Sequence, residues 1–79
     1  MSAATTIDEE LKVEYEIIQS LVDARKANGL TQKQLAEKTG ITQSDISKLE
    51  NGGANPSLRT LRRLAAALGM RVKIEFVAR

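Results

Sequence analysis

The sequence predicts an all-α domain of four to five helices, followed by one C-terminal β-strand. Three observations support this: apolar residues recur at helical spacing through most of the chain, N-cap residues and glycines divide that pattern into short segments, and only the last ten residues alternate with a period of two. The 79 residues leave room for one domain. A domain of this size buries roughly 60–65% of its unfolded surface, so we expect association between copies to support it.

The composition argues against several classes of protein. Without cysteine or histidine the chain has no disulfide, no thiol nucleophile and no imidazole base, and a zinc site is not expected. The acidic residues show no matched acid–base pair and the glycines form no phosphate-binding loop, so we expect neither an enzyme nor a cofactor. The sequence has no apolar run near the ~20 residues of a membrane span, and its first residues lack the apolar region of a signal peptide, so we expect neither feature. We therefore expect a cytoplasmic protein with no membrane contact.

The charges are unevenly distributed. Residues 1–20 carry five carboxylates against one lysine, whereas residues 21–79 carry eleven basic and five acidic groups. A basic body with an acidic leader is typical of a polyanion-binding module that carries an appendage of opposite sign. Charge alone leaves the ordinary scatter of a solvated surface equally open.

The first predicted helix is long. Thr6 or Asp8 is a candidate N-cap, and Asn28-Gly29 is a C-cap signal. Its N-terminal half is expected to project beyond a compact core. The apolar residues that recur between these ends are Leu11, Tyr15, Ile17, Ile18, Leu21 and Val22.

Two short helices follow. The first opens at Thr31, with a glutamine at capping-box spacing, and stops at Thr39-Gly40. The next opens at Thr42 and ends at Asn51-Gly52-Gly53. Their inward-facing residues are expected to be Leu35, Ala36, Ile46 and Leu49.

A fourth helix is capped by Ser57 and stopped by Gly69, after which the pattern changes. Its apolar stripe consists of Leu58, Leu61, Leu64, Ala65 and Leu68. The residues after it alternate between apolar and charged, which predicts a strand from Met70 to Val77.

A single strand needs a partner for its backbone groups, and no other segment of the sequence has the pattern of a strand. The simplest partner is the same strand of a second subunit, which predicts a dimer interface. Its apolar members are Met70, Val72, Ile74 and Phe76. The chain then divides into an N-terminal extension with the start of the first helix (1–17), a helical domain (18–69) and a dimerisation strand (70–79).

The central segment brings two short helices together across a tight turn. Ala36 is small where the second helix must pass close, and Gly40 tolerates a positive φ. Three apolar residues, Ile41, Ile46 and Leu49, are expected to hold the second helix on the core. Its outer face then carries Gln43, Ser44, Ser47 and Lys48. This short polar face suits a DNA major groove, where glutamine pairs with adenine and lysine reaches guanine.

This segment resembles the helix-turn-helix of the Cro and phage-repressor family, the Xre-like regulators. The resemblance covers roughly residues 18–69 and implies a lambda-repressor-like DNA-binding domain. The strings that carry it are Leu30-Thr31-Gln32, Leu35-Ala36, Gly40-Ile41, Ile46-Ser47 and Leu49-Glu50-Asn51-Gly52.

The resemblance assigns roles to residues of this chain. Base edges would be met by Gln43 and Ser44, with Ser47 and Lys48 one turn further along. Gln32 would contact a phosphate or support the recognition glutamine. The other phosphate contacts would come from Asn51, the Gly52-Gly53 backbone, Ser57 and Arg59. Arg25 and Glu50 match a structural ion pair of such domains.

Two departures from the family pattern refine the hypothesis: a strand stands where a fifth helix is common, and the leader is acidic. In both respects the chain is similar to helix-turn-helix antitoxins of type II toxin–antitoxin pairs, which repress their own operon. The partners implied are a second copy, a pseudo-palindromic double-stranded operator and a basic toxin bound through residues 7–20. A stand-alone Xre-type regulator, or a protein–protein module without DNA binding, is the alternative.

Overall fold

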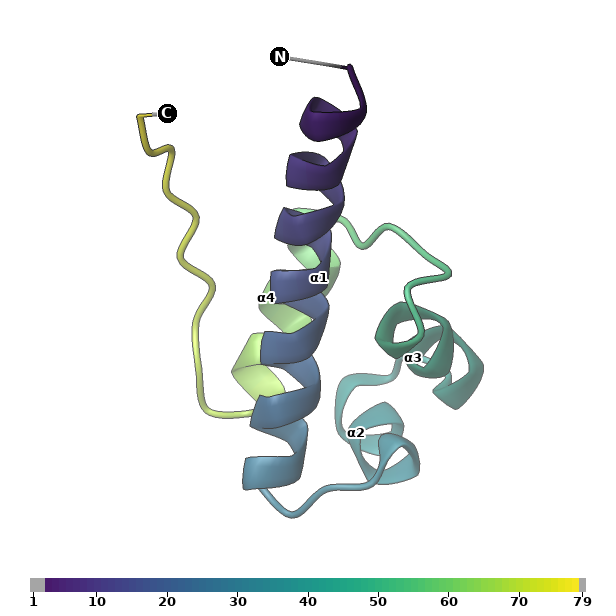
Figure 1. The fold of residues 1–79 in the computed structure, drawn as a ribbon. Coiled ribbons are helices and arrows are strands. Elements are labelled where there is room, and N and C mark those ends of the chain that lie inside the picture. Colours follow the sequence, from purple (N-terminus) through teal and green to yellow (C-terminus); the bar gives the residue numbers. More distant parts are fainter. Residues whose placement is uncertain (1–2, 79) are drawn as a thin grey trace.

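The computed structural model describes residues 3–78, with side chains from residue 12 onward. Four helices follow one another along the described chain: α1 (Ala3–Ala27), α2 (Gln32–Thr39), α3 (Gln43–Glu50) and α4 (Leu58–Ala67) (Figure 1). The long α1 projects past the other helices, which gives the molecule extents of 44 × 23 × 21 Å. Because α1 begins at Ala3, Thr6 and Asp8 lie within the helix, and the prediction that either residue caps it is wrong. Ala3 and Ala4 favour the helical conformation and extend it upstream of both polar residues.

The two central helices begin at their predicted caps. Thr31 Oγ1 accepts a hydrogen bond from the Gln34 amide at 3.1 Å, and Gln34 Oε1 accepts one from the Thr31 amide at 2.8 Å, which completes the capping box. Thr42 Oγ1 accepts from the Asp45 amide at 3.1 Å. Between the helices, Gly40 has a φ of 75° and its N–H donates to the Ala36 carbonyl at 2.9 Å. A side chain is strained at this φ, so glycine allows the tight turn that sets α3 against α2.

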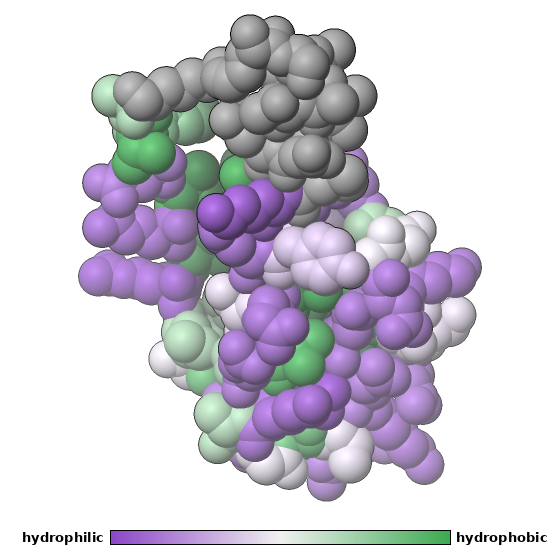
Figure 2. Space-filling view, viewed as in Figure 1, coloured by the Kyte–Doolittle hydropathy of each residue, from purple (hydrophilic) through white to green (hydrophobic). Residues whose placement is uncertain are grey.

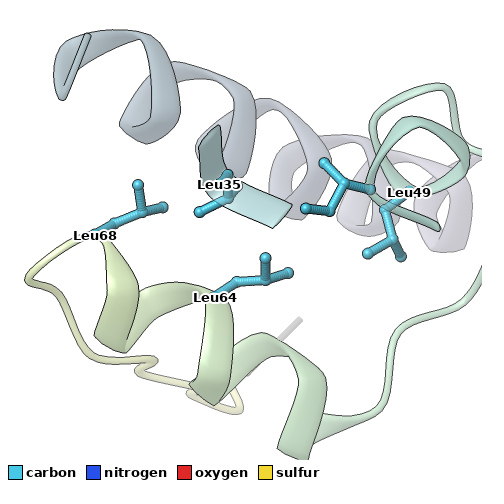
Figure 3. Packing of buried hydrophobic residues seen from close by; sticks show 5 residues of the cluster. Leu35, Leu49, Leu64 and Leu68 are labelled. Atoms are coloured by element: carbon cyan, nitrogen blue, oxygen red, sulfur yellow. The ribbon is translucent and has the colours of Figure 1, made fainter. Parts of the chain in front are cut away.

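Five leucine and isoleucine side chains form the core. Leu35 from α2, Ile46 and Leu49 from α3, Leu64 from α4 and Leu68 just after it are each at most 5% exposed (Figure 3). Residues of α1 pack against this cluster, among them Leu21 and Ala24. The other residues packed on it are Leu30, Ala36, Ile41 and Ala67. The expected apolar stripe of α4 is correct except at its first residue, because the Leu58 side chain is 58% exposed in the opening turn.

The chain reverses direction after α4. Gly69, with a φ of 69°, donates to the Ala66 carbonyl at 3.1 Å, and Met70 donates to the Ala65 carbonyl at 2.8 Å. This pair of bonds is a Schellman motif, and it closes the helix. We call residues 70–78 the tail, and it runs back along α1 (Figure 1).

The strand predicted over Met70–Val77 is not formed in the described chain, and this prediction needs correction. None of the backbone–backbone hydrogen bonds between described residues involves residues 71–78. A strand is defined by a ladder with a neighbour, and residues 3–78 fold entirely into helices and connections, so they offer the tail no strand to pair with. In the tail, hydrophilic side chains project outward, away from the helices (Figure 2).

Candidate nucleic-acid interface

The burial of two residues determines which face of α3 is exposed to solvent. Ile46 is fully buried and Leu49 is 5% exposed, so the opposite face of this eight-residue helix turns to solvent. Gln43, Ser44 and Lys48 are exposed there, and Ser47 is half-buried. The structure therefore brings the four side chains predicted to meet base edges onto the outward side of one short helix.

The end of α3 is tied to α1 by an ion pair between Arg25 and Glu50. Arg25 Nε donates to Glu50 Oε2 at 2.7 Å, and Arg25 Nη2 donates to Glu50 Oε1 at 2.9 Å, which makes the pair bidentate. The side chains are 12% and 5% exposed. The pair that the family resemblance implies is thus present, and it is largely removed from water.

Two further groups complete this network. Arg25 Nη1 donates to the Leu30 carbonyl at 2.8 Å, and Gln32 Nε2 donates to Glu50 Oε1 at 3.1 Å. One arginine and one glutamate therefore connect α1, the loop before α2, α2 itself and the last residue of α3. We call Arg25, Gln32 and Glu50 the α1–α3 lock.

Opposing effects act on the pKa of Glu50. Burial favours the neutral acid and by itself would raise the pKa. The hydrogen bonds from Arg25 and Gln32, with the positive charges of Arg25 and Lys26, outweigh burial and hold the pKa of Glu50 below its usual value. The lock is therefore made with an ionised carboxylate.

Gln32 has a role that the sequence did not indicate. It was expected to contact a phosphate or to support the recognition glutamine, and in the structure its amide binds Glu50. It therefore holds the C-terminal end of α3, at Glu50, and not Gln43 at the other end. Gln32 and Glu50 are 18 positions apart and belong to different helices, so the periodicity within one helix gives no sign of the contact.

The predicted phosphate-contacting residues lie at the end of α3 and the start of α4. Asn51 is exposed, and its Nδ2 donates to Ser47 Oγ at 3.4 Å. Ser57 caps α4: its Oγ accepts from the Thr60 amide at 3.1 Å and shares a hydrogen bond with Thr60 Oγ1 at 3.0 Å. Arg59 is exposed in the first turn of α4.

The described residues form neither a metal site of the usual ligands nor a membrane-spanning helix. Residues 12–78, whose side chains are described, contain no cluster of histidine, cysteine, aspartate or glutamate that could hold a metal ion. No helix in the described part of the chain has the length and apolar character needed to cross a membrane.

The motif and its geometry agree with a known family. The helix-turn-helix family model HTH_3 matches residues 21–74. The chain belongs to this family. The resemblance drawn from the motif strings is thereby confirmed, and this family of HTH_3 proteins is one of DNA-binding transcriptional regulators, not of enzymes.

Two curated relatives of this HTH_3 chain illustrate the similarity. An uncharacterized HTH-type transcriptional regulator of Haemophilus influenzae is 37% identical over 65 residues, which cover 82% of this chain and 66% of that protein. The immunity repressor protein of Bacillus phage phi105 is 48% identical over 48 residues, which cover 61% of this chain and 33% of the repressor. The chain thus spans about two thirds of the first relative and one third of the second.

A solved structure resembles this HTH_3 chain over nearly its whole length. It is described as a toxin–antitoxin module from Streptococcus pneumoniae, and it superposes with a TM-score of 0.65 at 28% sequence identity. The match covers 98% of this chain and 83% of the other one. The similarity therefore extends over both the helix-turn-helix and most of the segments that flank it.

Proposed function

We propose that this protein is a sequence-specific DNA-binding repressor. The observation that carries the proposal is the fixed presentation of α3: Ile46 and Leu49 are buried, the α1–α3 lock holds its last residue, and its outer face is polar. Because α3 is already held in place, it can bind in a major groove without a further loss of conformational entropy. The relationship to a phage immunity repressor supports repression as the mode of regulation.

The proposed contacts fall into two classes. Base edges are read by the outer face of α3, through Gln43, Ser44, Ser47 and Lys48. Phosphates are bound by Asn51, the Gly52-Gly53 backbone, Ser57 and Arg59, which set the register without reading sequence. Gln32 acts through Glu50 as a positioning residue.

A binding titration tests the DNA-binding function. A genome-wide footprint first identifies the operator, and fluorescence anisotropy then compares operator and scrambled duplexes at several salt concentrations. We expect specific binding to be at least about a thousandfold tighter than binding to the scrambled duplex, with both weakened by salt. Equal affinity for the two duplexes would refute a sequence-specific regulator and favour a protein–protein module.

We further propose that the protein acts as a dimer, in the cytoplasm at the nucleoid. Two recognition helices related by a two-fold axis read a pseudo-palindrome, with half-sites about one helical turn, roughly 34 Å, apart. The tails carry the association: pairing Met70–Val77 with the same segment of a second copy supplies the ladder that residues 71–78 lack within the described chain.

A more specific role, that of an antitoxin, is favoured by the match to the toxin–antitoxin module, which extends over 98% of this chain. In this role residues 7–20 bind a basic toxin. The side chains of residues 7–11 lie outside the described part, and among the rest Tyr15 is 73% exposed beside Glu14. An exposed aromatic residue next to carboxylates suits a basic protein surface.

The neighbouring gene separates this role from that of a stand-alone regulator. If it encodes a basic toxin, its expression should arrest growth, and co-expression of this protein should restore growth. Deletion of residues 1–12 should weaken this rescue while operator affinity stays unchanged or rises slightly, because like charge near phosphates is removed. A large loss of operator binding by the folded deletion variant would show that the leader serves DNA binding instead.

A further inference from the structure

The tail, α1 and α4 enclose an apolar groove. It has a volume of about 320 Å³. Its apolar lining consists of Val13, Ile17 and Leu21 from α1, Leu61, Leu64 and Leu68 from α4 and its end, and Met70, Val72 and Ile74 from the tail. The tail thus lies at one side of the groove without filling it.

The tail itself is incompletely covered. Phe76 is fully exposed, Ile74 is 58% exposed and Met70 is 56% exposed. Lys73 Nζ lies 3.9 Å from Glu75 Oε2, and a contact between residues two apart shows that both point to one side of an extended chain. The tail therefore has one apolar side and one charged side, as a strand does.

We propose that a second copy of this chain covers the groove in one defined register, with Ile74 on the two-fold axis and Phe76 of the partner subunit opposite Val72. This inference rests on the proposed dimer and deepens it, because it specifies which residues meet. The groove is complete only when the partner subunit's Phe76 lies over it.

The alternation of the tail excludes half of the antiparallel registers. In a two-fold symmetric antiparallel pair of tails, each residue lies opposite one residue of the partner subunit. The sequence numbers of these two residues add up to the same value for every such pair. If that value is odd, each apolar residue lies opposite a charged one and both faces of the ribbon are mixed. If it is even, the apolar side chains of both tails share one face, which can then lie on the groove.

Charge selects one register among the even ones. With Lys73 on the axis two lysines face each other, and with Glu75 on the axis two glutamates do. With Val72 on the axis Arg71 faces Lys73, and with Phe76 on the axis Glu75 faces Val77 and has no countercharge. With Ile74 on the axis, Lys73 lies opposite Glu75 of the partner subunit, twice by symmetry, and opposite charges face each other. Charge complementarity thus identifies a second copy as the occupant of the groove.

The same register gives α1 a place in the interface. Val13 and Ile17 line the groove and are one helical turn apart, whereas Tyr15 lies on the other side of the helix with Ile18, near Asn51 and Gly52. Val13 and Ile17, which lie within the segment assigned to a toxin, therefore face the second copy. Tyr15 and Glu14 remain for another partner.

Disulfide trapping tests the register, because the chain contains no cysteine. Ile74→Cys should form a covalent dimer readily under a glutathione redox buffer, since opposite Cα atoms lie within bonding range. Lys73→Cys and Glu75→Cys should each cross-link poorly alone, and a mixture of these two variants should cross-link well. Preferential cross-linking of Lys73→Cys or Glu75→Cys alone would overturn the proposed register.

Sedimentation of the full chain tests whether the partner subunit's Phe76 lies over the groove. Phe76→Ala and Ile17→Ala should each raise the dimer Kd roughly ten- to a hundredfold, and Tyr15→Ala on the opposite side of α1 should leave it unchanged. An unchanged Kd for Ile17→Ala, or a monomeric wild-type protein, would overturn the proposal. Operator titration of the same samples shows separately whether DNA binding itself fails.

Discussion

The α2–α3 unit and the tail are both short and partly charged, yet they differ in where their hydrogen-bond partners and their apolar contacts come from. In the α2–α3 unit both helices have side-chain N-caps, and Leu35, Ile46 and Leu49 are buried within the chain. In the tail, residues 71–78 make no backbone hydrogen bond to the rest of the described chain, and Phe76 is fully exposed. The α2–α3 unit satisfies its hydrogen bonds and buries its apolar residues within the chain. We expect the tail to do so only against another molecule.

Removal of the tail should have the largest effect. Truncation after Gly69, or Ile74→Pro, which deletes a ladder donor, should give a monomer in sedimentation and reduce operator affinity by about a thousandfold or more, close to the level for non-specific DNA. The circular dichroism signal of the helices should remain, because all five core residues precede the tail. A truncated protein that stays dimeric and binds its operator would place the interface on the helices.

Breaking the α1–α3 lock comes next. Glu50→Gln leaves the Arg25 guanidinium without its countercharge at a site where both side chains are largely buried, and should cost about 3–5 kcal/mol of unfolding free energy. Asp23→Asn is a matched control, because Asp23 accepts an exposed hydrogen bond from Gln19 at 2.8 Å and should cost less than about 1 kcal/mol. Urea unfolding measures both. Equal costs would show that the lock contributes no more than a surface contact.

The stability of the lock should depend on pH in one direction. The pKa of Glu50 lies below its unfolded value of about 4.3, so the unfolded state binds the additional proton and the folded state does not. The stabilisation is present above that pH and is lost as the pH falls through the folded pKa, while Arg25 stays protonated. The difference in unfolding free energy between wild type and Glu50→Gln should therefore shrink on acidification below about pH 4.3. A difference that stays constant down to pH 2 would contradict an ionised lock.

A base-reading residue should have a selective effect. Gln43→Ala should lose roughly 1–3 kcal/mol of binding free energy on the operator and little on random DNA, because only base contacts distinguish the two. Anisotropy titrations on both duplexes measure this. An equal loss on both would show that Gln43 does not read a base.

The smallest effect is expected from a single phosphate contact. Arg59→Ala should weaken binding to all duplexes alike and reduce the salt slope by about one unit. Lys12→Ala removes the same charge from the projecting part of α1 and serves as the control, with no change in slope expected. A slope that both variants lower equally would indicate a general charge effect.

The sequence predicted the parts of the fold that depend on neighbouring residues. Thr31, Thr42 and Ser57 are N-caps in the structure, because a cap is decided within one turn of helix. The hydrogen bond from Gln32 to Glu50 was not predictable, since it joins residues that only the packing of α2 against α3 brings together. The strand was wrongly predicted for the described chain because alternation indicates which residues share a face but supplies no pairing partner.

The reversal at Gly69 has a practical consequence. Because the tail returns along α1, the two ends of the described chain lie at the same end of the molecule, far from α2 (Figure 1). A flexible peptide can therefore fuse one copy to the next without crossing the recognition helix. In such a tandem protein a substitution can be placed in one copy only. Its effect on DNA binding can then be measured while the other copy stays intact on the same DNA.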